Sequence, residues 1–510
     1  MAKVSELELD RNTSETNKDK ASSLPPVSLM ERLKFICNPV NIFNFLTIEP
    51  FLICFFFPQI ISGLAVKHFN EVKACRADLN YSESICKTAF SSEFKDNITL
   101  EAMHGAQQMV ADMTAWQQPL QSGIPAIIIL FVGAWSDKTG NRKALMLMPI
   151  VGEIISAIGL IFATYYFLEW PLWITALIEV LPSAMFGGLS IALMGSYSYI
   201  ADVTTLESRT FRVGIVAIIV TLSLPVGNSI SGVLTEAVGY YGIFGINLGL
   251  FCFGFIFTFF RVKDVKKEPL KGSFFEIIVQ FFDTKNARDT FSLIVLSRGK
   301  KLVNILLVIC THIVIFGTIH GESHYIYLYA QNKFNMDMVG FSLFTTYSAL
   351  MGLAGTTIAV TIFSKLLQMH DAVIGVIATS CKITASIVYG LAPNRNWLFS
   401  GPAFDLFGNS GTTVIRSLGT KVVEPDEVGK MCSLIGFVEA LVPVIYVPIY
   451  SMVYNHTIKT FTGAFYLLGA LTTVPAVFNF LFLYRSLKKD VVKNPDLKEM
   501  HAHENAVTVL

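Results

Sequence analysis

Several ionisable residues of this chain stand inside long apolar stretches, where a charge is costly. Arg416 lies near the end of an apolar block at 396–419, and Glu439 lies near the middle of another at 431–454. A charged side chain inside a bilayer is costly and rare, so each such residue is a functional candidate. We expect Arg416 to contact an anionic solute or an acidic gate residue, because its guanidinium forks toward carboxylate or phosphate. Snorkelling of Arg416 to the nearby water is the alternative.

Two further residues share the expected helix face of Arg416. Asn409 and Asp405 precede it by seven and eleven residues, which are close to whole turns of an α-helix. The spacing therefore predicts that Asp405, Asn409 and Arg416 line one solute-binding surface. Tyr325, in an earlier apolar block, is a candidate for stacking against the solute, with a place in an interfacial aromatic belt as the alternative.

Four residues are candidates for carrying a proton. Glu439 has no Lys or Arg within one helical turn, which suits a carboxyl group that takes up and releases a proton, although a structural hydrogen bond fits equally well. Glu322, His320 and His324 fall in one block at 302–329, and histidine changes charge between about pH 5 and 8. His320 and His324 are also spaced for a shared metal ion, but no second set of ligands accompanies them. Ordinary polar lining is the third interpretation.

Twelve apolar blocks must position these groups. Hydrophobic residues make up 53% of the 510 residues and charged residues only 15%, against about 25% in soluble proteins. Each block is long enough to cross a hydrocarbon core of about 30 Å as a helix. Glu153 and Glu179, in the third and fourth blocks, are weaker candidates for function. The expected spans are 42–66, 117–135, 144–167, 172–201, 212–235, 240–260, 302–329, 338–364, 372–391, 396–419, 431–454 and 461–484.

The spans predict an all-α polytopic membrane protein of two six-helix halves, with the solute site between them. Most of the 39 Lys and Arg residues lie in the tails, the central linker and the loops on the same side. By the positive-inside rule, both termini are therefore cytosolic. The expected divisions are a disordered tail at 1–40, a first bundle at 41–261, a basic linker at 262–301, a second bundle at 302–485 and a tail at 486–510.

A long loop at 67–116 is expected on the opposite side of the membrane. It carries glycosylation sequons at Asn80 and Asn97, together with Cys75 and Cys86. Sequons and a nearby cysteine pair suit an oxidising, glycosylating compartment. The sequence predicts glycans on both asparagines and a Cys75–Cys86 disulfide, with two free thiols as the alternative.

Composition and motifs argue against other classes of protein. The formal net charge of +1 gives no support to a nucleic-acid partner. Neither a phosphate-binding Gly-x-x-x-x-Gly-Lys-Ser/Thr loop nor a dinucleotide glycine fingerprint appears, so we expect no ATP-driven pump, no enzyme and no cofactor. The expected partners are the lipid bilayer, protons and a small organic anion. Thr508-Val-Leu510 has the form of a C-terminal PDZ ligand, which is a weak pattern.

One segment between the second and third spans has a recognisable form. Its sequence is Gly-Ala-Trp-Ser-Asp-Lys-Thr-Gly-Asn-Arg-Lys, with defined positions at Gly133, Asp137, Lys138, Gly140, Arg142 and Lys143. Gly133 permits close helix approach and Gly140 permits a turn with positive φ. The segment resembles the loop signature of the major facilitator superfamily, in which this cluster latches the inner gate. A solvated basic turn is the alternative.

A second run, Ala201-Asp202-Val-Thr-Thr-Leu-Glu-Ser-Arg209-Thr-Phe-Arg212, resembles solute carrier family 46, the family of the proton-coupled folate transporter. Ile48-Glu49-Pro50 and Val414-Ile415-Arg416 are similar to motifs of that family as well. The resemblance implies the major facilitator fold and an anionic substrate such as a folate, a muropeptide, a cyclic dinucleotide or an organic conjugate. It also implies a plasma or lysosomal membrane.

Charges in this run are candidates for a gate. Asp202, Arg209 and Arg212, together with Glu49, can pair in one conformation and separate in another. Mutual neutralisation at a static interface is the alternative. The acidic residue that couples protons in the fifth helix of the folate transporter falls at Ala217 in this chain.

The sequence thus predicts a secondary active transporter, and specifically a proton-coupled symporter of an anionic organic solute that works by alternating access. A transporter-like sensor or scaffold that binds solute without cycling is one alternative. A metal ion carrier that uses the histidines at 302–329 is the other.

Overall fold

The computed structural model is all-helical and describes residues 47–91, 96–203, 206–264, 299–423 and 428–493. The predicted tail at 1–40, most of the linker and the C-terminal PDZ pattern lie outside the described residues. The first half comprises α4 (Glu49–Lys73), η1 (Ala74–Asp78), α5 (Glu83–Ala89), α6 (Asn97–Thr139), α7 (Arg142–Tyr165), α8 (Leu172–Met185), α9 (Gly188–Val203) and α10 (Leu206–Arg261). The second half comprises α13 (Gly299–Phe334), α14 (Met338–Ile358), η2 (Ala359–Leu366), α15 (Asp371–Leu391), α16 (Arg395–Phe404), α17 (Ser410–Val422), α18 (Val428–Thr457) and α19 (Ala464–Lys493).

Nine helical segments of the described chain are long and apolar enough to cross a membrane, so this is a multi-span membrane protein. One of them, Ile218–Arg261, covers two expected spans, which Gly239 divides with φ 65° and ψ −176°. The span expected at 117–135 lies inside α6, and the one expected at 396–419 is divided between α16 and α17. These three differences account for the gap between nine segments and twelve predicted spans.

The predicted loop at 67–116 is largely helical. α4 continues to Lys73 and η1 to Asp78, while α6 begins at Asn97, well before the predicted start at 117. Polar residues in these extensions suggested a loop, but many of them face other helices: Asn70 is 3% exposed and Gln107 is fully buried. The prediction was wrong because it took the polar residues to face solvent, whereas many of them face the protein interior.

The short elements between α4 and α6 carry the predicted disulfide. It joins Cys75 of η1 to Cys86 of α5, with the Cα atoms 6.0 Å apart. Asp96 caps α6 by accepting from the Thr99 N–H over 2.8 Å, and the hydrogen bonds from Thr99 lower the pKa of this carboxyl group. The sequon residues Asn80 and Asn97 are exposed. We term the end of the molecule with the disulfide the outer end and the opposite end the inner end.

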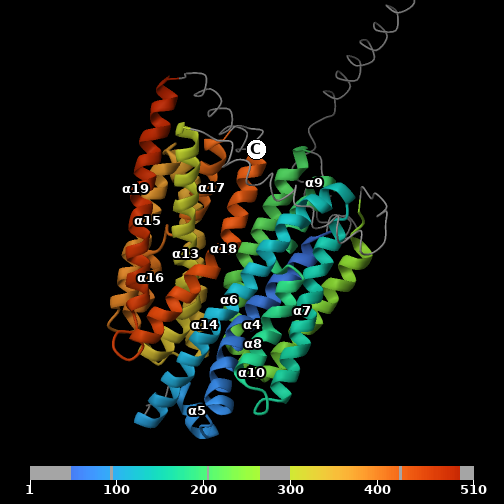
Figure 1. Ribbon diagram of the computed structural model, residues 1–510, viewed down its shortest axis with the longest axis vertical. Helices are drawn as coiled ribbons and strands as arrows, with labels where there is room; N and C mark the ends of the chain where they lie inside the picture. Colours follow the sequence, from blue (N-terminus) through green and yellow to red (C-terminus); the bar gives the residue numbers. More distant parts are fainter. Residues whose placement is uncertain (1–46, 92–95, 204–205, 265–298, 424–427, 494–510) are drawn as a thin grey trace, which may run out of the picture. The chain divides into compact units, whose positions relative to one another are not determined.

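Helix packing organises the two halves and joins them (Figure 1). In the first half α10 packs along α4 and α7, and α7 also packs against α8 and α9. In the second half α13 packs against α18 and α19, and α15 packs against α19. α6 runs along α18, and α10 runs along α14, so these pairs join the halves.

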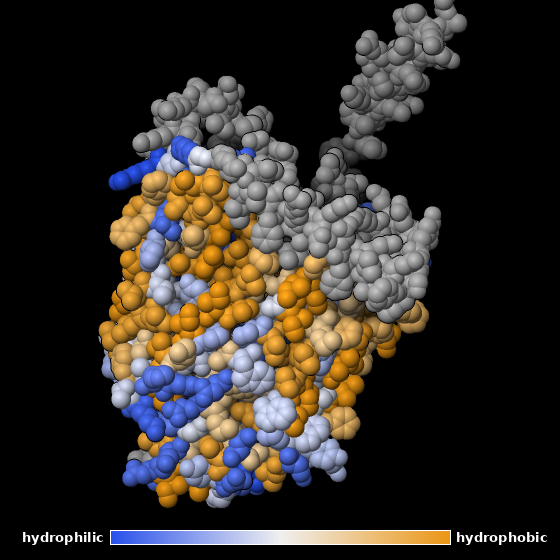
Figure 2. Space-filling model, in the orientation of Figure 1, coloured by the Kyte–Doolittle hydropathy of each residue, from blue (hydrophilic) through white to orange (hydrophobic). Residues whose placement is uncertain are grey.

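On the face shown in Figure 2, apolar side chains cover much of the helices, as contact with lipid requires, and hydrophilic side chains gather toward the lower end of the view. Large side chains such as Phe260, Leu471 and Phe478 are between 65% and 74% exposed. The polar residues described below therefore lie mostly between helices.

Two predicted helices are broken. α8 ends at Met185 and α9 begins at Gly188, and the turn between them uses Gly187 and Gly188 at φ 87° and 49°, values that favour glycine. α16 ends at Phe404 and α17 begins at Ser410. Broken helices at the midplane are a common way to build a solute or ion site in a transporter.

Gly355 of α14 allows this helix to approach the break between α16 and α17. A Cβ atom at this position would overlap the carbonyl group of Leu406, which is backbone and cannot rotate away. We expect Gly355→Ala to destabilise the protein by about 1–3 kcal/mol and to lower the melting temperature of the purified chain. Gly245→Ala is the matched control because its Cβ would have nothing within 4 Å. Equal melting temperatures for the two variants would contradict this packing argument.

Candidate functional site

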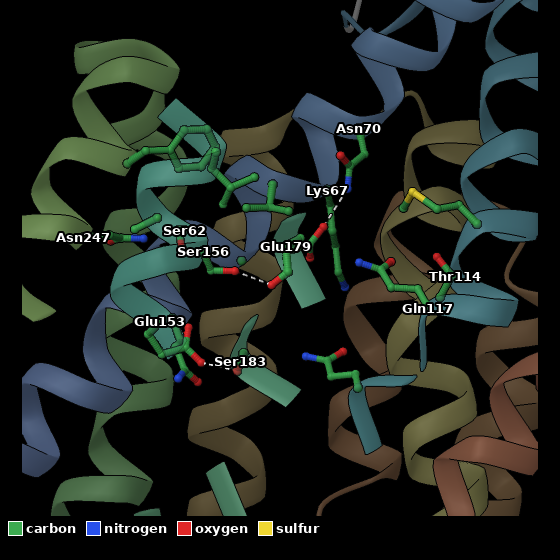
Figure 3. Close-up of a pocket in the computed structure, with 18 of the residues that line it drawn as sticks. Ser62, Lys67, Asn70, Thr114, Gln117, Glu153, Ser156, Glu179, Ser183 and Asn247 are labelled. Carbon is green, nitrogen blue, oxygen red and sulfur yellow. Dashed lines mark hydrogen bonds between the residues drawn. The ribbon is translucent and has the colours of Figure 1, made fainter. Parts of the chain in front are cut away.

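A cavity of about 340 Å³ lies among α4, α6, α7, α8 and α10, with α13 of the second half closing one side (Figure 3). We term it the first-half cavity. Of the predicted site residues, only His324 lines it, together with the weaker candidates Glu153 and Glu179. Its other polar lining includes Gln59, Ser62, Lys67, Asn70, Thr114, Gln117, Gln118, Gln121, Ser156, Ser183 and Asn247.

Two carboxylates occupy neighbouring positions on the wall of this cavity. Ser183 Oγ donates to Glu153 Oε1 over 2.5 Å, which ties α8 to α7. Asn70 Nδ2 donates to Glu179 Oε2 over 3.3 Å, which ties α4 to α8 (Figure 3). Both carboxylates are therefore held by neutral donors.

Lys67 extends from α4 into the same cavity (Figure 3). Its Nζ donates to the carbonyl oxygen of Ser323 in α13 over 3.4 Å, a long contact between the two halves. His324 Nδ1 lies 2.7 Å from the His320 carbonyl oxygen, so Nδ1 carries a proton, and in the neutral form of the ring Nε2 is an acceptor. The cavity therefore offers groups of both charges to a solute.

A second polar cluster, which we term the acid–lysine triad, consists of Glu322, Lys382 and Asp405. Lys382 Nζ lies 2.8 Å from Glu322 Oε2 and 3.2 Å from Asp405 Oδ2. Ser386 Oγ donates to Glu322 Oε1 over 2.7 Å, whereas Asp405 Oδ1 is buried without a hydrogen-bond partner. Two carboxylates against one ammonium leave the triad with one excess negative charge when all three are ionised.

The triad corrects the prediction that Asp405, Asn409 and Arg416 share one helix face. The chain is not helical between Phe404 and Ser410, so the face that begins at Asp405 does not continue to Arg416. Asp405 turns to Lys382 instead. Asn409 packs against Gly352 of α14. A Cβ atom added at Gly352 would overlap the amide nitrogen of Asn409.

Tyr325 also differs from its predicted role. Its side chain is fully buried, and its hydroxyl donates to the Val447 carbonyl oxygen over 3.2 Å. Its ring stacks on Tyr454 with the ring centroids 5.6 Å apart. Tyr325 therefore packs α13 against α18 and contacts neither the cavity nor the lipid.

Arg416 and Glu439 form a charged cluster with His312 between α17, α18 and α13. Arg416 Nε donates to Glu439 Oε1 over 3.0 Å, and Nη2 lies 2.6 and 2.5 Å from the two carboxylate oxygens. His312 Nε2 lies 2.8 Å from Glu439 Oε1. The Arg416 side chain is 57% exposed and that of Glu439 only 16%. Glu439 is thus not an isolated carboxyl group. It pairs with Arg416, which lies on a different helix.

His320 lies beside Phe316, with the ring centroids 4.2 Å apart. Among the described residues, no group of three His, Cys, Asp or Glu side chains is arranged to hold a metal ion.

The predicted loop motif at 133–143 is described in part, at the inner end. Gly140 ends α6 with φ 67°, the positive value that its sequence position predicts. Arg142 Nε donates to Asp202 Oδ2 over 2.9 Å, and Nη1 donates to Ser136 Oγ over 2.8 Å. The backbone N–H of Lys143 donates to Asp264 Oδ1 over 2.9 Å. These bonds tie the inner ends of α6, α7, α9 and α10 together.

A second pair of predicted gate residues meets nearby. Arg212 Nη2 lies 3.2 Å from Glu49 Oε1, and both residues are buried. This ion pair ties α10 to α4 inside the first half. The side chains of Asp137, Lys138 and Arg209 lie outside the described part of the structure, and so do the surroundings of Gly133.

Hydrogen bonds between the two halves gather at the outer end, around the buried Gln107 of α6. Gln107 Nε2 donates to the Leu328 carbonyl oxygen over 3.3 Å, and its Oε1 accepts from Tyr454 over 3.2 Å and from Asn332 over 3.1 Å. Ser451 Oγ of α18 donates to the Ala111 carbonyl oxygen over 2.7 Å. The structure thus holds the halves together at the outer end.

Comparisons with known proteins agree with this architecture. The family model described as Major Facilitator Superfamily matches residues 97–445. The chain is 23% identical over 436 residues to a probable peptidoglycan muropeptide transporter SLC46 of Drosophila melanogaster, covering 83% of this chain and 82% of that protein. It is 24% identical over 437 residues to the lysosomal proton-coupled steroid conjugate and bile acid symporter SLC46A3 of Gallus gallus, covering 83% and 91%. It is 24% identical over 357 residues to the proton-coupled folate transporter of Rattus norvegicus, covering 68% and 73%.

Solved structures show the same fold. The human organic anion transporter MFSD10 is 14% identical and covers 85% of this chain and 97% of its own, with a TM-score of 0.57. The POT family transporter PepTSo is 11% identical and covers 86% and 98%, with a TM-score of 0.58.

Proposed function

The chain belongs to the major facilitator superfamily, a family of transporters and not of enzymes, and we propose that it is a proton-coupled symporter of an anionic organic solute that works by alternating access. The observation that carries the proposal is the polar first-half cavity, which α13 of the second half closes on one side. The hydrogen bonds around Gln107 close the outer end in the same structure. A cavity walled mainly by one half and contacted by the other, in a protein whose halves are joined at one end, suits a carrier that opens to one side at a time.

Two cations support an anionic solute. Lys67 reaches into the first-half cavity, and more than half of the Arg416 side chain is exposed. The guanidinium already holds a carboxylate, that of Glu439, so an anionic group of the solute can compete for the same donors. Glu439 then acts as an internal counter-ion that returns to Arg416 once the solute has left.

We assign proton coupling to the acid–lysine triad. Glu322 was a sequence-based candidate, and it shares Lys382 with Asp405. Because the ionised triad carries one excess negative charge, uptake of one proton neutralises it. Glu439, by contrast, receives donors from Arg416 and His312, which stabilise its charged form.

The relatives support a plasma or lysosomal membrane, and the disulfide suits either setting. The outer end then faces the extracellular space or the lysosomal lumen, with glycans on the exposed Asn80 and Asn97 and both termini in the cytosol.

The proposal is tested by uptake into proteoliposomes that hold the purified full chain. Labelled folate, taurocholate and muramyl dipeptide are offered at external values of about pH 5.5 and about pH 7.4, with a neutral interior. We expect acid-stimulated uptake of at least one solute, and we expect a protonophore to abolish the stimulation. Uptake without pH dependence would reject proton coupling. Saturable binding without uptake or counterflow would instead identify a sensor that does not cycle.

A further inference from the structure

We propose that the first-half cavity binds a zwitterion: an organic acid that also carries a free ammonium group, with hydroxyl or amide groups between the two charges. The proposal rests on the proposed function, because it names the class of solute that the same site carries. It goes further in assigning a cationic group to a solute that would otherwise be described only as an anion.

Carboxylates outnumber the ammonium groups on the cavity wall. Glu153 and Glu179 both line it, and Lys67 is the only Lys or Arg among the described lining residues. Ser183 and Asn70 donate neutral hydrogen bonds to the two carboxylates and bring no compensating charge. Lys67 can balance only one of the two carboxylates, so a second group with a positive charge and several N–H donors suits this wall, and an ammonium has both properties.

Two buried acceptors on the same wall have no donor. Asn70 Oδ1 and Asn247 Oδ1 lack a hydrogen-bond partner, although these residues are only 3% and 5% exposed. The orientation of the Asn70 amide is fixed, because its Nδ2 donates to the Glu179 carboxylate. An unsatisfied buried acceptor costs about 1–3 kcal/mol, and a solute rich in N–H or O–H donors removes this cost. His324 adds a further acceptor through Nε2.

Lys67 can bind the acidic group of the same solute. Its ammonium makes one long hydrogen bond, to the Ser323 carbonyl oxygen, which leaves donor capacity for a carboxylate or phosphate. Thr114, Gln117 and Gln121 line the space around it and can bind sugar hydroxyls or peptide groups. A volume of about 340 Å³ lies at the lower end of the range for small-molecule sites. The site therefore fits a dipeptide or an amino-sugar acid.

Matched pairs of probes test the ammonium directly. Muramic acid and the dipeptide Ala-Gln each carry an amine and a carboxylate, and N-acetylation replaces the ammonium of each with a neutral amide. Dissociation constants for all four are measured on the detergent-purified full chain from ligand-induced shifts in melting temperature. We expect each zwitterion to bind at least about tenfold more tightly than its N-acetyl derivative.

Variants locate the effect. Glu153→Gln and Glu179→Gln keep the shape of each side chain but remove its charge, and the double variant should reduce the preference for the free amine to about onefold. Lys67→Met should weaken all four probes. Glu236→Gln is the matched control, because Glu236 is exposed and does not line the first-half cavity. The preference of the Glu236→Gln variant for the free amine over the N-acetyl form should equal that of the unmodified protein.

Equal or tighter binding of the N-acetyl forms would overturn the proposal, and so would the absence of binding by every probe at about 10 mM. An amine preference that survives in the double variant would also overturn it, because the ammonium would then lie elsewhere. The outcome is separable from that of the proposed function. Binding with the expected preference but without uptake rejects transport alone, and acid-driven uptake without the preference rejects the zwitterion alone.

Discussion

Replacement of Asp405 with Asn is expected to abolish proton-driven accumulation of the solute while solute exchange continues. Asp405 is the more weakly held carboxylate of the acid–lysine triad. Its Oδ2 lies 3.2 Å from Lys382 Nζ, and its Oδ1 is buried without a partner. Glu322 receives hydrogen bonds from Lys382 over 2.8 Å and from Ser386 over 2.7 Å. A proton on Asp405 therefore neutralises the triad with the smallest loss of hydrogen bonding.

Asparagine imitates the protonated carboxyl group permanently. A carrier with a neutral triad can still bind solute and change conformation, but it has no proton to release on the inner side. The ratio of internal to external solute in proteoliposomes should fall to about 1 under an inward proton gradient. Counterflow, which needs no net proton movement, should stay within about threefold of the unmodified protein.

The matched control is Asp371→Asn, the same substitution at an ion pair outside the triad. Asp371 Oδ2 lies 2.9 Å from Lys421 Nζ at the inner end of the second half, and its loss should leave accumulation intact. Lys382→Met tests whether the cation is needed to hold the two carboxylates of the triad together. It leaves two carboxylates close together without a cation, which should cost about 3–5 kcal/mol and lower the yield of folded protein. Normal accumulation by the Asp405→Asn variant would remove the triad from proton coupling.

The fold could be predicted because helices that contact lipid must be apolar, and long apolar blocks are easily recognised in the sequence. Each lipid-exposed helix needs about 20 apolar residues, and twelve such blocks stand out in the sequence. The same signal fails where a helix faces protein. The polar residues of α4 beyond 66 and of α6 before 117 were assigned to a loop, although they lie on helices whose polar sides are buried. The break between α16 and α17 carries a signal that the span prediction did not use, because Asp405, Gly408 and Asn409 are residue types that favour turns.

The candidate site could be predicted only as single residues. Glu322 lies on α13, Lys382 on α15 and Asp405 in the break between α16 and α17, and only the folded structure shows that they share charges. Glu439 looked isolated because the cation that pairs with it is 23 residues away in the sequence. One signal for the first-half cavity was present and unused. Thr114, Gln117 and Gln121 recur at helical spacing, which places them on one face of α6.

Replacement of Arg416 with Gln should reduce uptake of the transported solute by at least about tenfold at normal surface expression. Arg416 donates three hydrogen bonds to Glu439 and presents a side chain that is 57% exposed. Glutamine keeps neither the charge nor the forked donors. Glu439 would then depend on His312 alone, and the protein would lose an exposed cation that can bind an anionic solute.

A double variant separates the two roles of this guanidinium. If Arg416 serves only to neutralise Glu439, removing both charges in Arg416→Gln/Glu439→Gln should restore uptake. We expect no recovery, because the exposed guanidinium also contacts the anion of the solute. Arg395→Gln is the control: Arg395 lies at the start of α16 with its guanidinium 5.7 Å from the Phe399 ring centroid, and its loss should leave uptake near normal. Normal uptake by Arg416→Gln would mean that Arg416 only snorkels to water, and recovery in the double variant would limit its role to charge balance.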